Sequence, residues 1–254
     1  MSRATAATRR QLGLEVIIVL GVSYGASGLQ SALDLLKSVA ATPIPLSQQV
    51  ASTFYRQADP HVWLDIAYQT LAILTGLVPV ALVAYLLVRD GESLATVGVD
   101  TEQPAEDARW GIGLALVVGL VGLGFRVVAN TLGINLQLTI GSTGQWWQLV
   151  ILVLQSAVTA IGEELIVLAF LLHRFAQLGW SDRKSITVSA LVRGSYHLYQ
   201  GFGGGLANMA MGLVFGWLYK RRGRVVPFVI AHFLIDVVAT IGYVELHNRI
   251  HWLH

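Results

Sequence analysis

The sequence contains no cysteine and few charged residues. The missing cysteines exclude disulfides and cysteine-ligated metal, although they fix no redox compartment. Charged residues make up only 13% of the 254 residues, whereas a soluble domain carries about 25%. Hydrophobic residues make up 54%, and the net charge of +2 is too small to indicate a nucleic-acid partner. This composition predicts a single polytopic membrane domain over residues 1–254.

Long apolar runs predict an all-α bundle of transmembrane helices. A helix needs about 20 apolar residues to cross the hydrocarbon. The segments that approach this length number seven, and the basic then apolar N-terminus reads as a retained first span. Two short segments, 43–60 and 245–254, are candidates for helices at the membrane interface, so the predicted number of spans is seven or eight. The seven ranges are 13–38, 62–88, 109–133, 147–174, 185–200, 205–220 and 225–244.

Basic residues near the ends of the spans predict the orientation. They precede the first span, lie between the fourth and fifth, and lie between the sixth and seventh; their members include Arg9, Arg183 and Arg222. The rule that such residues face the cytoplasm therefore predicts a multi-pass protein of the cell membrane with a cytoplasmic N-terminus. The loop 89–109 disagrees mildly, because it falls on the same side yet holds six acids and two arginines.

Small residues predict one close helix contact. Gly212 and Gly216 form a GxxxG pair in the sixth span, and this spacing lets a neighbouring helix approach closely.

Ionisable residues inside the spans concentrate in the second half of the chain. Such residues are costly in a bilayer, so they indicate a functional site. Spacing groups them, because residues four apart share a helix face. Arg193 and His197 in the fifth span, and His232 and Asp236 in the seventh, are such pairs. Glu163 and Glu164 in the fourth span are adjacent, so they point about 100° apart around their helix.

Approximate depths predict that these helices converge on one polar cavity, open to the cytoplasmic half of the bilayer. Glu163 is about sixteen residues, roughly 24 Å, into its span. His232 lies about eight residues into a span that starts at the cytoplasm. A buried carboxylate beside imidazoles can take a proton from water, and polar donors can hold the oxyanion that forms next. A carboxylate, imidazoles and polar donors are the groups that water-mediated peptide hydrolysis uses.

The words "GEE", "RGSYHLYQG" and "RVVPFVIAHFLID", in this order on three predicted spans, resemble the CAAX protease and bacteriocin-processing (CPBP) family. The resemblance covers roughly residues 150–243, within a catalytic-type core at about 147–244. It implies a glutamate-dependent intramembrane endopeptidase of the bacterial type. By resemblance Glu163 activates water, Glu164 supports it, His197 positions the water, and His232 polarises the scissile carbonyl together with Asp236. The implied partners are the bilayer and a membrane protein or peptide substrate, without a cofactor or nucleic acid.

Two positions depart from the family pattern. The usual first motif is EExxxR, but Leu168 occupies the place of the arginine. Arg174 lies about 15 Å further along a helix and does not replace it. We therefore predict that Arg193 supplies the cation and pairs with Glu164. The last motif often ends in Asn, whereas an ionised Asp236 accepts a hydrogen bond and does not donate one.

Other functions remain open from the residues alone. Two histidines and a glutamate are also a zinc ligand set, although HExxH is absent. Acids and histidines inside spans also mark the ion paths of transporters. A catalytically inactive family member that binds a membrane partner is a further alternative, in which the acids form a structural ion pair with arginine.

Overall fold

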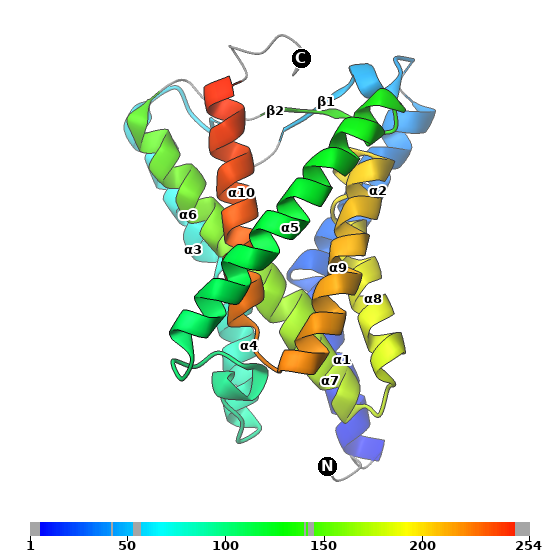
Figure 1. Cartoon of the computed structure of the whole chain (residues 1–254), viewed down its shortest axis with the longest axis vertical. Helices are drawn as coiled ribbons and strands as arrows, with labels where there is room; N and C mark the ends of the chain where they lie inside the picture. Colours follow the sequence, from blue (N-terminus) through cyan, green and yellow to red (C-terminus); the bar gives the residue numbers. More distant parts are fainter. Residues whose placement is uncertain (1–5, 42, 53–56, 140, 142–144, 247–254) are drawn as a thin grey trace.

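The computed structural model describes residues 6–41, 43–52, 57–139, 141 and 145–246, and these form a helical bundle (Figure 1). The all-α fold predicted from the sequence is confirmed. Each of the seven predicted ranges corresponds to a helical segment. The helices are α1 (Ala6–Gly21), α2 (Tyr24–Ala40), α3 (Val62–Gly76), α4 (Val78–Arg89), α5 (Pro104–Thr131), α6 (Trp146–Gly162), α7 (Leu171–Gln177), α8 (Asp182–Ser195), α9 (Phe202–Arg222) and α10 (Val226–Leu246).

Some of these helices are joined into longer rods. Within the described residues, three helical stretches are long and apolar enough to cross a membrane: Val62–Arg89, Pro104–Thr131 and Trp146–Gln177. The α1–α2 pair, bent by 52°, would form a fourth as one broken span. Helix α8 has 14 residues and ends at Ser195, short of the predicted limit at residue 200. The total of seven spans therefore stays a prediction.

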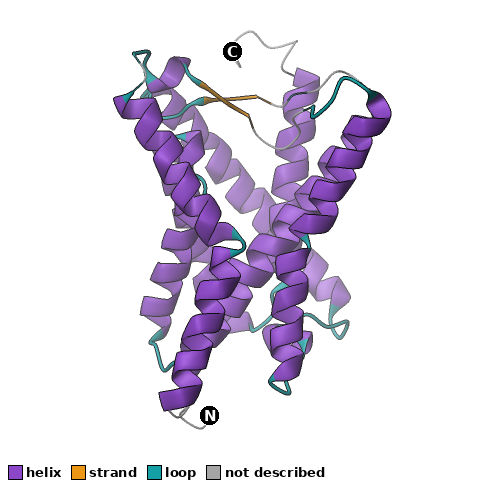
Figure 2. Ribbon diagram, turned by 180° about the vertical axis from the view of Figure 1, so that it is seen from behind, coloured by secondary structure: helices purple, strands orange, loops and turns teal. Residues whose placement is uncertain are grey.

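Two of the predicted features at the ends of the bundle need correction. The segment 43–60 was expected to form an amphipathic helix, but its described part contains a single 3₁₀ turn, η1 (Leu46–Gln48), and the short strand β1 (Val50–Ser52). The strand pairs in parallel with β2 (Gln137–Thr139), which satisfies the backbone groups that a helix would have used. Figure 2 shows both strands at one end of the bundle. The expected tail helix lies largely outside the described residues.

The opposite end of the bundle collects the basic residues. Helix α1 begins there, and α4, α7 and α9 end there (Figure 1). The acid-rich loop after α4 folds against these basic ends: Asp90 contacts Arg174, and Asp100 contacts Arg224. The loop also contains the 3₁₀ turn η2 (Leu94–Val97). Its acids therefore neutralise arginines, which explains why an acidic loop lies on the basic side.

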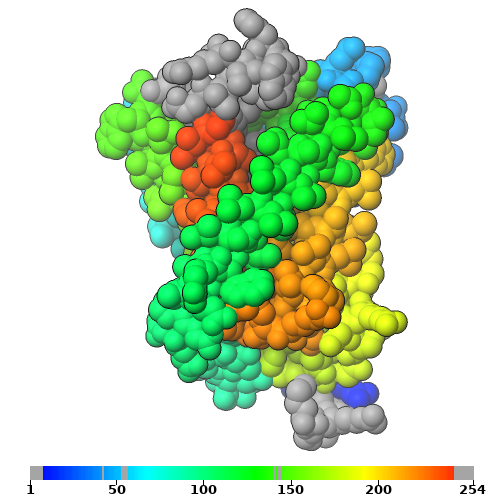
Figure 3. All heavy atoms as spheres, viewed as in Figure 1, coloured from blue at the N-terminus to red at the C-terminus, as the bar shows by residue number. Residues whose placement is uncertain are grey.

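Helices α8 and α9 pack closely, as the GxxxG pair predicts. A Cβ added at Gly212 would lie 3.0 Å from the Cα of Ala190, and one at Gly216 would lie 2.9 Å from the Cγ2 of Ile186. Any larger residue there would push the two helices apart. Helix α5 lies diagonally across one face of the molecule, over α9 and α10 (Figure 3).

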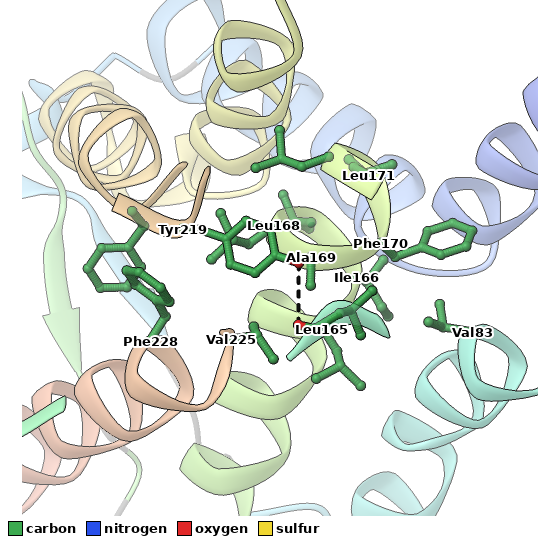
Figure 4. Packing of buried hydrophobic residues seen from close by; sticks show 14 of the residues in the cluster. Val83, Leu165, Ile166, Leu168, Ala169, Phe170, Leu171, Tyr219, Val225 and Phe228 are labelled. Carbon is green, nitrogen blue, oxygen red and sulfur yellow. Dashed lines mark hydrogen bonds between the residues drawn. The ribbon is translucent and has the colours of Figure 1, made fainter. Parts of the chain in front are cut away.

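The apolar core surrounds the segment that follows α6. This segment, η3 (Glu163–Phe170), is π-helical and all of its residues are buried. Its side chains pack against Val83 of α4, Tyr219 of α9 and Phe228 of α10 (Figure 4). π-helical turns are rare and are frequent at functional sites. The core thus holds the two adjacent acids in a fixed place.

Candidate active site

The acid pair occupies the first two positions of the π-helical segment. Glu163 and Glu164 are 3% and 0% exposed. Two carboxylates at this depth require partners, because an unpaired buried charge is strongly destabilising. The partners come from two other parts of the chain: the end of α8 with the residue that follows it, and α10.

Arg193 of α8 contacts both acids. Its Nη2 atom donates to Glu164 Oε1 at 2.7 Å, and its Nη1 atom donates to Glu163 Oε2 at 3.4 Å. Leu168, at the place of the family's usual arginine, is 2% exposed and lies in the apolar core. The predicted contact between Arg193 and Glu164 is therefore present, and the cation reaches the acids from a different helix.

His232 of α10 lies between two carboxylates. Its Nδ1 atom is 2.7 Å from Glu164 Oε1, and its Nε2 atom is 3.5 Å from Asp236 Oδ2. The i, i+4 spacing on α10 thus places both residues on one face, as predicted. Glu164 Oε1 contacts both Arg193 and His232, so this acid orients the imidazole of His232.

His197 reaches the site in a way that the sequence did not predict. It was expected on a helix face shared with Arg193, but α8 ends at Ser195 and His197 follows, just before the 3₁₀ turn η4 (Leu198–Gln200). Its Nδ1 atom is 3.1 Å from the carbonyl oxygen of Arg193. A carbonyl oxygen only accepts, so Nδ1 carries the hydrogen and Nε2 of the neutral ring is left to accept. His197 also interacts electrostatically with Glu163.

Two tyrosines belong to the site and were missed in the sequence. The hydroxyl of Tyr196 donates to Glu163 Oε2 at 2.7 Å. Tyr24 of α2 packs on Tyr196 with ring centroids 4.8 Å apart. Gly162 makes room for it, because an added Cβ would lie 2.4 Å from the Tyr24 hydroxyl. Tyr196 stands beside His197 in a quoted motif, which was an available signal; Tyr24 has no such signal.

The two acids therefore differ in their free oxygens. Glu163 uses Oε2 for Tyr196 and Arg193. Glu164 uses Oε1 for Arg193 and His232, while its Oε2 is buried and has no hydrogen-bond partner among the described residues. This difference favours Glu163 as the acid whose second oxygen meets a reactant. Within the described ranges, no group of three or more His, Asp or Glu side chains is arranged to hold a metal ion.

One comparison with known proteins matches the segment that carries the site. Residues 145–238 match a family model described as "Rce1-like: Type II CAAX prenyl endopeptidase Rce1-like". The matched segment runs from the start of α6 into α10 and contains every predicted site residue. No curated protein and no solved structure matches the chain. Over residues 145–238, the chain is therefore similar to the CAAX protease-like membrane proteins whose motifs the sequence resembles.

Proposed function

We propose that the protein is an intramembrane endopeptidase that hydrolyses a peptide bond of a membrane-associated protein or peptide with a water molecule activated by Glu163. The observation that carries the proposal is the difference in contacts between the two acids. Glu164 contacts Arg193 and His232 through Oε1 and its Oε2 is fully enclosed, whereas Glu163 contacts Arg193 and Tyr196 through Oε2, which leaves Oε1 for a reactant. The family whose model matches residues 145–238 is a protease family, which supports the same reaction class.

The proposed reaction gives each side chain of the site a role. Water lies between Glu163 Oε1 and His197 Nε2, and Glu163 takes its proton as the oxygen attacks the scissile carbonyl carbon. His232 donates from Nε2 to the resulting oxyanion. Glu163 then returns the proton to the leaving amine nitrogen. Glu164 holds the His232 ring in position through Nδ1, and Arg193 contacts both acids. Before substrate binds, Nε2 of His232 lies 3.5 Å from Asp236.

Replacement of the proposed base tests this function on a mixture of candidate substrates. The purified protein is reconstituted with membrane proteins from cells that lack it, and newly formed N-termini are labelled and identified by mass spectrometry. We expect Glu163→Gln to form them about 10²- to 10⁴-fold more slowly, because a positioned general base contributes that much. Glu92→Gln, a change of the same kind in an acid outside the site, should retain the wild-type rate.

Other outcomes identify the alternatives. Equal cleavage by wild type and Glu163→Gln would refute the proposed base, and cleavage that is stopped by a chelator would favour a zinc protease. No new N-termini from the wild type would favour an inactive family member or a transporter, which a flux assay in proteoliposomes separates. Crosslinking of substrate to the Glu163→Gln variant would identify the substrate class.

We also propose that the protein lies in the cell membrane with the start of α1 on the cytoplasmic side. The clustering of α1, α4, α7 and α9 ends with the basic residues supports this orientation. A topology reporter fused after residue 222 should read cytoplasmic, and the opposite signal would reverse the orientation.

A further inference from the structure

Four aromatic rings contact one another in series beside Glu163. Tyr24 packs on Tyr196 with ring centroids 4.8 Å apart, and Tyr196 packs on His197 at 4.7 Å. The ring of Tyr199 then lies nearly parallel to that of His197, with centroids 6.4 Å apart and 25° between the planes. The hydroxyl of Tyr196 donates to Glu163. Tyr199, at the other end of the series, has no role in the reaction proposed above.

The hydroxyl of Tyr199 has a hydrogen that is free to donate. Gln200 Nε2 donates to this hydroxyl at 3.0 Å, so the phenol oxygen is the acceptor in that hydrogen bond. The hydroxyl's own hydrogen has no acceptor in the described part of the chain. A hydrogen bond received at the oxygen also polarises the O–H group and makes it a better donor. Because Tyr199 is only partly buried, a reactant can reach this hydrogen.

The phenol of Tyr199 is placed near both carboxylates that flank the imidazoles. It interacts electrostatically with Glu163 and with Asp236. The 3₁₀ turn η4 that carries it is fixed from outside, because the backbone N–H of Leu136 donates to the carbonyl oxygen of Gln200 at 3.0 Å. A tied turn holds a side chain more precisely than a free loop does. The ring is therefore held between the water-activating and the carbonyl-polarising halves of the site.

The proposed reaction gives the oxyanion a single donor, Nε2 of His232. Asp236 follows on the same face of α10 and lies 3.5 Å from that nitrogen. An ionised carboxylate accepts hydrogen bonds and donates none, so Asp236 adds no donor where the new negative charge develops. Tyrosine hydroxyls are among the groups that stabilise such a charge when they are aimed at it. The free hydrogen of Tyr199 meets this need.

We infer that Tyr199 is a second oxyanion donor, whose hydroxyl donates a hydrogen bond to the oxygen of the tetrahedral intermediate beside Nε2 of His232. This role rests on the proposed function. The phenol keeps its proton throughout, because Glu163 takes the proton of the attacking water and returns it to the leaving amine. The contribution of Tyr199 is thus a hydrogen bond that is stronger to the oxyanion than to the neutral carbonyl.

Removal of the hydroxyl alone tests the inference. Tyr199→Phe keeps the ring that lies against His197. Cleavage is followed through the newly formed N-termini of the membrane-protein mixture, at saturating amounts of that mixture. We expect the rate to fall about 10²-fold, because loss of one oxyanion donor costs about 10²- to 10³-fold in kcat. The acid limb of the pH–rate profile should stay in place, since Glu163 keeps its contacts. Tyr85→Phe, which removes an exposed hydroxyl on α4, should retain the wild-type rate.

A second substitution separates a donor from a structural role. Asp236→Asn places an amide donor on the face of α10 that carries His232, so it should raise the rate of Tyr199→Phe at least about tenfold. Unfolding in mixed micelles checks that both variants are folded.

Three outcomes would overturn the donor role and leave the proposed base in place: a wild-type rate in Tyr199→Phe, a loss of rate that only follows a loss of folded protein, or no restoration by Asp236→Asn. Equal cleavage by wild type and Glu163→Gln, or no cleavage by the wild type, would instead reject the proposed function and this inference with it.

Discussion

Two buried arginines of this protein sit in similar surroundings but in different kinds of site. Arg174 of α7 and Arg193 of α8 are 0% and 1% exposed, and each lies beside a phenylalanine ring, Phe170 and Phe215 respectively. Each also contacts more than one acid. Arg174 lies 2.7 Å from Asp90 and 3.2 Å from Glu15, and Arg193 lies 2.7 Å from Glu164.

The acids around the two arginines differ. Of the acids around Arg174, Asp90 and Glu92 are partly exposed. All three acids have second cations, because Glu15 and Asp90 also contact Arg89 and Glu92 contacts His173. Those around Arg193 are buried, and their other partners are an imidazole and a phenol. The first cluster joins α1, α4 and α7 at the end of the bundle, and the second lies in the middle of it.

This contrast shows that a buried ion pair does not by itself mark an active site. A cluster in which every acid binds a cation has a structural role, because it joins the helices that carry its members. A cluster becomes suited to proton transfer when one acid keeps an oxygen for a reactant and imidazoles stand beside it. The Glu163 cluster has these features. In the Arg174 cluster, by contrast, each acid contacts more than one cation.

The largest expected effect is a difference between the two arginine replacements. Arg193→Met should lower the free energy of unfolding by about 3–5 kcal/mol, because it strands two buried acids. Arg174→Met should lower it by about 1–3 kcal/mol, since Arg89 and His173 still contact its acids. Unfolding in mixed micelles measures both. Cleavage per folded molecule should survive Arg174→Met and be lost in Arg193→Met.

A double-mutant cycle sharpens this comparison. Arg193→Met combined with Glu164→Gln should cost less than the sum of the separate losses, with a coupling of about 0.5–3 kcal/mol, because the two side chains share one interaction. The control cycle pairs Arg174→Met with Glu164→Gln, whose side chains belong to separate clusters. Simple addition of the losses for Arg193 and Glu164 would remove the basis for assigning Arg193 to the acid pair.

A smaller effect is expected from the tyrosine that distinguishes the two clusters. Tyr196→Phe removes the hydroxyl that donates to Glu163 Oε2. A hydrogen bond to a charged group contributes about 1.5–3 kcal/mol, so we expect a loss of roughly tenfold or more in kcat with little change in KM. The position of the acid limb of the pH–rate profile should also shift, because the carboxylate loses a donor. An unchanged profile with a lower stability would assign Tyr196 a purely structural role.

The sequence predicted the helical bundle and the acids and imidazoles of the site because these features are local patterns. Apolar runs and i, i+4 pairs are visible within a few turns. The π-helical turn at Glu163 and the end of α8 before His197 depend on packing between distant segments, so they were not predicted. For the same reason, the sequence did not predict that Tyr24 packs against Gly162 at the site, or which acids pair with Arg174. The substitution of the motif arginine by Leu168, by contrast, correctly directed attention to Arg193.

The smallest expected effect concerns a third arginine, at the basic end of the bundle. Arg224 donates to Asp100 at 2.9 Å, and the backbone N–H of Glu102 donates to the same carboxylate at 2.8 Å. The backbone hydrogen bond and then the arginine lower the pKa of Asp100 below its ordinary value. A lowered pKa in the folded state means that the stabilisation is fully present above the unfolded-state pKa, about 3.9, and is lost as the pH falls through the folded-state value.

Asp100→Asn should therefore flatten the loss of thermal stability between about pH 5 and pH 3, whereas stability near pH 7 should fall only slightly, since the loop is partly exposed. Melting curves across this pH range measure the effect, with Asp34→Asn, an exposed acid on α2 without an ion pair to arginine among the described residues, as the control. If wild type and Asp100→Asn lose the same thermal stability as the pH falls from about 5 to 3, this loop contact, unlike the cluster around Arg193, contributes no measurable stability.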